Sequence, residues 1–102
     1  MTSGITVLVL QWAHAGRAAE LGLVEDVLSQ LAVDHGAELE RYRGTGFGSY
    51  AEGAAPDEVH ILRFPNKAAV DEYVADPERA PWALQLGDVL ARTMVIQLDA
   101  WG

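Results

Sequence analysis

The chain begins with an apolar segment, residues 5–12 (ITVLVLQW), that is rich in β-branched and large side chains and contains no helix breaker. This composition predicts a central strand that is apolar on both faces. Because successive side chains of a strand point to opposite faces, the segment divides into two sets. One set contains Thr6, Leu8, Leu10 and Trp12, and the other contains Ile5, Val7, Val9 and Gln11.

A helix is predicted after this strand. Over residues 17–34 the apolar positions recur at helical spacing, at Leu21, Val24, Val27, Leu28 and Leu31. Gly36 comes directly after His35 and suits the left-handed turn that commonly ends a helix. Residues 38–43 are polar and alternating, which predicts a second, more exposed strand.

The second half of the chain contains two more predicted strands and two helical segments. Residues 58–64 (EVHILRF) predict a strand that Pro65 stops, and Asn66 is a good N-cap for a helix over residues 67–75. Pro77 breaks that helix. Pro81 suits the first turn of a further segment, which carries on one face Trp82, Leu86, Val89 and Leu90. The last strand is predicted over residues 93–101, and residues 44–57 form the one long loop.

The resulting order of strands and helices, βαββαβ, is the ferredoxin-like α+β arrangement, a four-stranded antiparallel sheet with its helices on one face. We expect residues 1–102 to form this single domain. The face without helices would carry Val7, Val9, Val59, Ile61 and Val95. So large an apolar face should not meet water, which predicts a homodimer in which two sheets close face to face.

Composition and charge argue against several classes of binding partner. The 102 residues include no cysteine and carry a formal net charge of −8. Nucleic acids and anionic membranes are unsuited to such a chain, because both require clustered positive charge. The longest apolar stretch is too short to span a bilayer, and the N-terminus lacks the basic region and cleavage site of a signal peptide. A cytoplasmic protein is therefore the default expectation.

The size, the topology and the segment from His60 to Leu86 resemble the dimeric α+β barrel proteins. The local features that carry the resemblance are Phe64-Pro65 at a strand end, a helix containing Tyr73, and the turn over residues 76–78. Residues 34–37 are similar to uncharacterised families of the same group. This superfamily includes stress-responsive barrel proteins such as olivetolic acid cyclase, and cofactor-free antibiotic-biosynthesis monooxygenases. The resemblance therefore implies a fold and leaves the chemistry open.

The resemblance also implies a ligand pocket between the sheet and its helices. The residues implied to line it are Thr6, Leu8, Leu10 and Trp12 on the first strand, His60, Leu62 and Phe64 on the third, and Tyr73 and Trp82 on the helices. Alternation along residues 58–64 independently puts His60 on the side of Leu62 and Phe64. The chain departs from the cyclase at Arg79 and Thr6, which align with its two histidines, so the cyclase mechanism does not transfer as it stands.

His60 is the main candidate for chemistry. A neutral imidazole can accept or donate a proton near neutral pH, and Leu62 and Leu8 are expected to surround it with apolar groups. Tyr73 could donate a hydrogen bond to a carbonyl or enolate, and Arg79 could hold a carboxylate or enolate oxygen. Each has a structural alternative: a histidine satisfied within the core, an amphipathic core tyrosine, and a solvated arginine at a helix start.

Other residues and motifs are less informative. Trp12 and Trp82 could stack on a flat ligand or could simply pack in the core, and His14 is expected at the pocket mouth. No metal site is expected, because the histidines lack ligand spacing and no cysteine supports them. No cofactor is expected either, because residues 44–48 (GTGFG) do not have the spacing of a dinucleotide fingerprint. A nucleophilic serine is not expected, because Ser3, Ser29 and Ser49 lack the context of a nucleophile.

Three functions fit these expectations. The first is a cofactor-independent cyclase or isomerase of specialised metabolism, acting on a polyketide-like carbonyl compound with His60 as base and Tyr73 or Arg79 holding the oxyanion. The second is a cofactor-free monooxygenase of the antibiotic-biosynthesis type, in which a substrate carbanion reacts with dioxygen near Trp12 and Trp82. The third is a non-catalytic ligand-binding or stress-related dimer. All three predict a small apolar or aromatic ligand.

Overall fold

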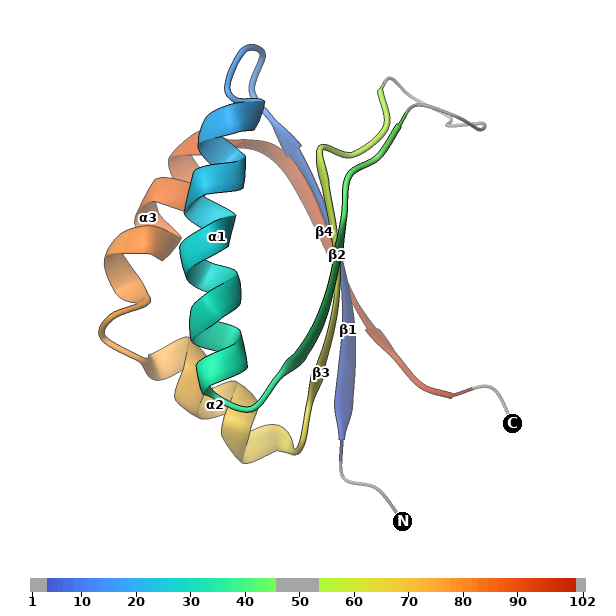
Figure 1. Ribbon diagram of the computed structural model, residues 1–102, viewed down its shortest axis with the longest axis vertical. Helices are drawn as coiled ribbons and strands as arrows, with labels where there is room; N and C mark the ends of the chain where they lie inside the picture. The colour runs from blue at the N-terminus through green and yellow to red at the C-terminus, as the bar shows by residue number, and fades with distance from the viewer. Residues whose placement is uncertain (1–3, 46–53, 101–102) are drawn as a thin grey trace.

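The computed structural model describes residues 4–45 and 54–100 (Figure 1). Four strands and three helices follow one another in the order β1 (Ile5–Ala13), α1 (Ala18–Asp34), β2 (Glu38–Tyr42), β3 (Glu58–Phe64), α2 (Lys67–Ala75), α3 (Ala80–Val89) and β4 (Leu90–Leu98). Of the predicted 44–57 loop, residues 46–53 lie outside the described part, as do Ser3 and Trp101.

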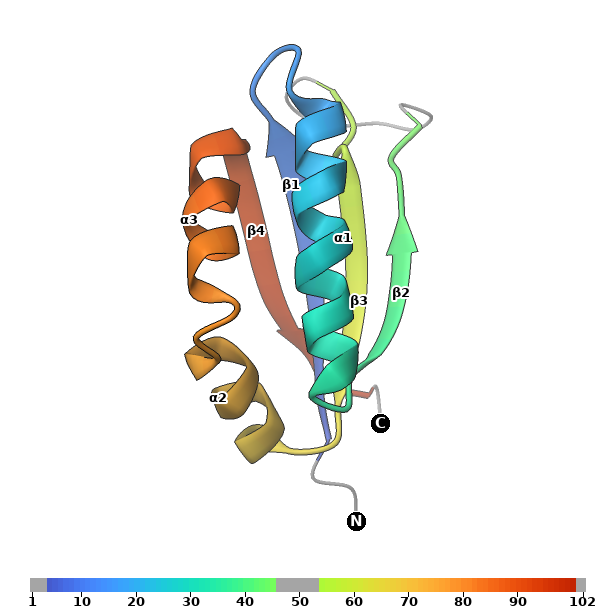
Figure 2. The ribbon, with the colours of Figure 1, turned by 60° about the vertical axis from the view of Figure 1, so that its left-hand side comes forward.

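The four strands form one antiparallel sheet in the order β2-β3-β1-β4. All three helices lie against one face of this sheet, and the other face is bare in the described residues (Figure 1). In the turned view α1 and α3 run side by side in front of the strands, with α2 below α3 (Figure 2). The predicted ferredoxin-like α+β fold is confirmed.

Local sequence signals set the ends of several elements. The Asn66 side chain accepts a hydrogen bond of 2.9 Å from the Ala69 backbone N–H, and this cap starts α2 at its predicted first residue. Gly36 lies in the turn that follows α1 and has a φ of 91°, a conformation that favours glycine. Leu90, expected on the helix, is instead the first residue of β4. An apolar residue at that spacing suits either element, so the sequence did not mark this boundary.

The register between β1 and β3 decides which side chains of β1 face the helices. Val9 pairs with His60 and Val7 pairs with Leu62, and directly paired residues of antiparallel strands share a face. The helix side of β1 therefore carries Val7, Val9 and Gln11. The opposite side carries Thr6, Leu8, Leu10 and Trp12. The expectation that this second set faces the pocket is wrong, because alternation defines two faces without saying which one meets the helices.

The bare face of the sheet is largely apolar. Strand pairing places on it Leu8, Leu10, Val59, Ile61, Met94, Ile96 and Leu98. Val59 and Ile61 were predicted on this face, whereas Val7, Val9 and Val95 were predicted there and lie on the helix side, since Val95 pairs with Val9. On the helix side, the most deeply buried large side chains are Leu21 of α1 and Val89 of α3, each 0% exposed. Burying a leucine of this kind stabilises the fold by about 2 kcal/mol.

No helix in residues 4–45 or 54–100 combines the length and the apolar character needed to cross a membrane.

Candidate active site

A cavity of about 360 Å³ lies between the helix side of the sheet and the three helices. This volume is within the usual range of small-molecule sites, roughly 300–1,000 Å³. Most of its wall is apolar, with Val7, Val9, Leu28, Leu62, Phe64, Val70 and Leu86 among the lining residues. Val95 lines it as well and is 65% exposed, so the cavity opens to the outside beside β4.

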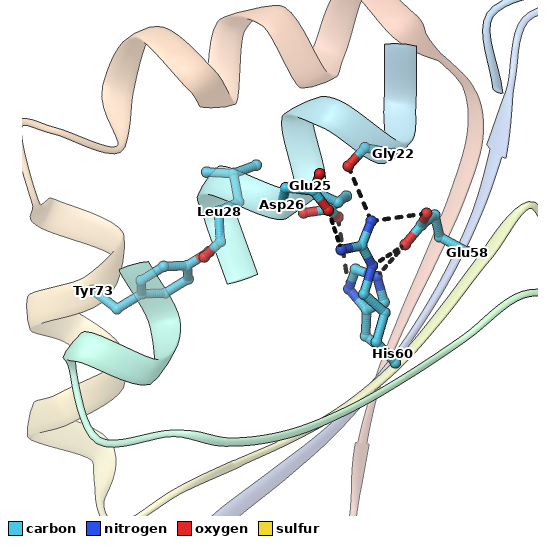
Figure 3. A network of polar contacts seen from close by, with 8 residues as sticks. Gly22, Glu25, Asp26, Leu28, Glu58, His60 and Tyr73 are labelled. Carbon is cyan, nitrogen blue, oxygen red and sulfur yellow. Dashed lines mark hydrogen bonds and ion pairs between the residues drawn. The ribbon is translucent and has the colours of Figure 1, made fainter. Parts of the chain in front are cut away.

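A buried histidine–glutamate pair lies on β3 at one side of this cavity. His60 and Glu58 are two residues apart on the strand and share a face, and their side chains meet with Nε2 2.7 Å from Oε1 (Figure 3). His60 is only 3% exposed and Glu58 8%. Arg41 of β2 holds the same carboxylate through Nε and Nη2, at 2.7 and 3.1 Å. The arginine is fixed in turn by Asp26 and by the Gly22 carbonyl of α1.

The charge of Glu58 determines how His60 is oriented. Burial alone would raise the pKa of Glu58, but the hydrogen bonds from His60 and Arg41 outweigh it and lower the pKa to about 2. An ionised carboxylate only accepts hydrogen bonds, so Nε2 of His60 must be the donor. In the neutral imidazole, Nδ1 is then the nitrogen with a free lone pair.

Nδ1 of His60 makes no hydrogen bond to a described residue, and its nearest charged neighbour is Glu25 of α1. The distance from Nδ1 to Glu25 Oε2 is 3.7 Å. Burial raises the pKa of Glu25, and the nearby imidazole and the Gln11 amide offset that effect only in part. The apolar surroundings expected for His60 are therefore wrong. Leu8 lies on the other side of the sheet, and both ring nitrogens face glutamates.

Tyr73 and Arg79 form the second polar group of the cavity wall. The Arg79 guanidinium lies 4.9 Å from the centre of the Tyr73 ring. The Tyr73 hydroxyl donates a 3.3 Å hydrogen bond to the Leu28 carbonyl, and burial raises its pKa. Arg79 Nε is buried and has no hydrogen-bond partner among the described residues. Of the two expected oxyanion donors, Arg79 thus has a free N–H, while Tyr73 already uses its proton.

The structure brings together five of the predicted site residues, which are His60, Leu62, Phe64, Tyr73 and Arg79. The other predicted residues lie elsewhere. Trp12 is on the bare face, where Arg92 lies 4.6 Å above its ring, and Trp82 is in a surface groove between α1 and α3. His14 is exposed after β1, and its backbone N–H donates to the Val89 carbonyl. A stacking platform of the two tryptophans in this cavity is therefore not formed.

Three buried polar residues of the cavity were not identified from the sequence as candidates: Gln11, Glu25 and Ser29, which are 3%, 5% and 9% exposed. Glu25 was recognisable, because it lies one helical turn from Leu21 and from Leu28 on the apolar side of α1. Gln11 was recognisable as the one amide in an apolar strand. Ser29 gave no comparable signal.

Two further sites can be set aside. A larger, shallower groove of about 850 Å³ lies outside the cavity between α1 and β2, and three of its polar residues, Asp26, Arg41 and Glu58, are already paired with one another. Within residues 4–45 and 54–100, no three histidine or acidic side chains are grouped so that they could hold a metal ion.

Comparison with known proteins gives structural similarity only. No protein-family model matches the chain, and no curated protein matches its sequence. A dimeric ferredoxin-like protein of unknown function from Jannaschia sp. CCS1 superposes with a TM-score of 0.77 and 19% identity, over 95% of this chain and 99% of that one. SnoaB, a cofactor-independent oxygenase from Streptomyces nogalater, gives a TM-score of 0.76 and 16% identity over 99% and 96%. An antibiotic biosynthesis monooxygenase gives 0.74 and 11% over 96% and 99%. At such low identity the similarity establishes the ferredoxin-like fold alone.

Proposed function

We propose that this protein is a cofactor-independent enzyme that abstracts a proton next to the carbonyl group of a small, largely apolar compound, and so acts as a cyclase or isomerase. The observation that supports this most directly is the state of His60. One ring nitrogen is fixed on an ionised glutamate. The other lies 3.7 Å from Glu25 at the wall of a mostly apolar cavity and makes no hydrogen bond to a described residue.

The proton transfer follows from this arrangement. Nδ1 of His60 takes the proton as the C–H bond breaks, and the electron pair of that bond forms the carbon–carbon double bond of an enolate. The carbonyl oxygen becomes an oxyanion, which the free Nε–H of Arg79 would stabilise. Glu58 stabilises the imidazolium that results. The enolate then regains a proton at another atom, which is isomerisation, or attacks a second carbonyl carbon, which is cyclisation.

The rest of the cavity suits a flat, uncharged or weakly acidic molecule. Leu62, Phe64 and Leu28 provide apolar walls, and such walls exclude the water that would otherwise compete for the base. Glu25, whose Oε2 lies 3.7 Å from Nδ1, is the acidic group that would receive the proton from His60 or return it.

A cofactor-free oxygenase is the second candidate, favoured by the likeness to SnoaB and to the antibiotic biosynthesis monooxygenase. It would begin with the same proton abstraction. The carbanion would then transfer electrons to dioxygen instead of regaining a proton.

We further propose that the protein works as a homodimer closed over the bare face of the sheet. That face exposes Met94, Ile96 and Leu98 by 38, 40 and 37%, a contiguous apolar surface that water does not favour. The Jannaschia protein of the same fold is described as dimeric.

Deuterium exchange tests the proposed chemistry. The protein is incubated in D₂O with 2-tetralone, an enolisable two-ring ketone, and label uptake next to the carbonyl is followed by NMR. His60→Gln is the decisive variant, because its amide can still donate to Glu58 where Nε2 did but provides no base at the position of Nδ1. We expect exchange to fall by roughly 10²–10⁴-fold in this variant while the protein stays folded.

The control is Gln30→Met, which alters an exposed residue of α1. Equal exchange by the unmodified protein and His60→Gln, or binding of 2-tetralone without any exchange, would contradict the proposal and favour the non-catalytic binding protein. Oxygen consumption during turnover, followed with an electrode, would select the oxygenase.

A further inference from the structure

Three buried polar atoms among the described residues have no hydrogen-bond partner: Gln11 Oε1, Ser29 Oγ and Arg79 Nε. All three residues line the same cavity. Buried polar atoms are normally paired, and an unpaired one is costly to the fold. Their convergence on one cavity indicates that its occupant supplies the missing partners.

The three atoms divide into two groups. Gln11 on β1 lies beside the Glu25 carboxylate, and Ser29 is one helical turn from Glu25 on the same side of α1. Arg79 lies over the Tyr73 ring. Figure 3 shows Glu25 and His60 on one side of the site and Tyr73 on the other. The cavity therefore has two polar ends.

The chemistry of each end defines the group it would bind. An amide oxygen such as Gln11 Oε1 only accepts, a serine hydroxyl both donates and accepts, and Arg79 Nε–H only donates. A hydroxyl group has both the proton that Gln11 Oε1 can accept and the lone pair that the Ser29 hydroxyl can donate to, and a carbonyl oxygen can accept from Arg79 Nε–H. A carboxylate or phosphate at the Gln11 end would face Glu25, which disfavours an anionic group there.

We propose that Gln11 and Ser29 form a hydroxyl subsite, so that the substrate is a two-ended molecule with a hydroxyl at this end and a carbonyl oxygen at Arg79. Both residues are more than nine-tenths buried, both line the cavity, and each has a polar atom with no partner among the described residues. The subsite deepens the proposed function and rests on it, because it assumes that the cavity is the substrate site. Gln11 and Ser29 are binding residues in this scheme and transfer no proton.

Binding of four matched two-ring compounds tests the subsite. Tetralin has neither a hydroxyl nor a carbonyl group, and 6-hydroxytetralin has the hydroxyl alone. The ketone 2-tetralone has the carbonyl alone, and 6-hydroxy-2-tetralone has both. Dissociation constants are measured by isothermal titration calorimetry with the unmodified protein, Gln11→Met, Ser29→Ala and the exposed control Gln30→Met. Ser29→Ala removes a single oxygen atom and keeps the test valid should Gln11→Met fold poorly.

In the unmodified protein and in Gln30→Met, we expect the hydroxyl to tighten binding by roughly 3- to 10-fold for both the ketone and the hydrocarbon. In Gln11→Met and Ser29→Ala this gain should disappear, while the gain from the carbonyl stays. A hydroxyl that adds no affinity, a gain that survives both variants, or no binding of any of the four compounds would overturn the subsite. Because binding is measured rather than turnover, failure of the proton transfer at His60 leaves these outcomes unchanged.

Discussion

Arg41 donates to both carboxylate oxygens of Glu58, with Nε 2.7 Å from Oε1 and Nη2 3.1 Å from Oε2. Two parallel hydrogen bonds of this kind fix the plane of a carboxylate as well as its charge. Glu58 is also the partner of His60. The orientation of the imidazole therefore depends on an arginine of β2, the edge strand that pairs with β3.

Removing Arg41 should therefore weaken the protein most clearly near neutral pH, and least in acid. The pKa of Glu58 is lowered from 4.5 to about 2, so the stabilisation from its ionised form is complete above 4.5 and is lost as pH falls toward 2. We expect Arg41→Met to lower the free energy of unfolding by about 2–3 kcal/mol near neutral pH, since the pair is only partly exposed. The difference between the two proteins should shrink below about pH 4. Urea unfolding across this range measures it.

The matched control is Arg63→Met, which breaks an exposed pair with Glu40 whose side chains are 47 and 44% accessible. Its effect should stay below about 1 kcal/mol at every pH. An equal loss in the two variants would contradict the role given to Arg41.

Replacement of Glu25 should have the opposite pH dependence. Burial raises the pKa of Glu25 above its ordinary value of 4.5, so its contribution is most favourable below that value and is lost as pH rises through the raised pKa. We expect Glu25→Gln to increase the free energy of unfolding by about 1 kcal/mol at about pH 8 and to change it little at about pH 4. The same substitution at exposed Glu72 on α2 should have no measurable effect at either pH. A loss of stability in Glu25→Gln at the higher pH would count against a raised pKa.

The two faces of the sheet should respond differently to a charge. Ile61→Lys places an ammonium group on the bare face, and we expect a folded protein that no longer associates at micromolar concentration. Val9→Lys places the same group on the helix side, where Val9 is 9% exposed, and should unfold the chain because an unpaired buried charge costs several kcal/mol. Analytical ultracentrifugation and circular dichroism distinguish these outcomes. A stable monomer of the unmodified chain would refute the dimer.

Arg79 should matter more to turnover than Tyr73. The Tyr73 hydroxyl already donates to the Leu28 carbonyl, so Tyr73→Phe should reduce deuterium exchange less than about tenfold. Arg79→Met removes the free N–H, and the expected loss is roughly 10²–10³-fold in kcat. Arg79→Lys keeps the charge but lacks Nε. If it restores full turnover, charge alone is sufficient and the directed hydrogen bond is unnecessary.

Most of the fold was predictable because its signals are local. The cap at Asn66, the turn at Gly36 and the apolar period of residues 17–34 each act within a few residues, and each element formed close to where they placed it. Alternation within β3 likewise gave the correct side for His60. Local signals of this kind can be recognised in a single sequence, because they do not depend on what packs against the element.

The errors come from contacts between strands. Both faces of β1 are apolar, so nothing within the strand shows whether Leu8 or Val9 faces the helices. Only the pairing of Val9 with His60 decides which face of β1 lies on the helix side. That one choice misplaced the first-strand residues of the pocket and three of the five residues predicted on the bare face. Glu25, which faces Nδ1 of His60, escaped for a related reason, because its contact with His60 joins two elements that are distant in the sequence. Glu25 approaches from α1, 35 residues earlier in the chain, and no pattern around His60 announces it.

The layered construction of the cavity couples its ligand to the cohesion of the molecule. Gln11 and His60 belong to the sheet, Glu25 and Ser29 to α1, and neither layer alone carries a complete site. A loosened state that kept its strands and helices but let α1 drift from the sheet would lose the site before it lost secondary structure. A molecule that contacts both layers binds only while they are packed together. Its binding therefore raises the free energy of unfolding.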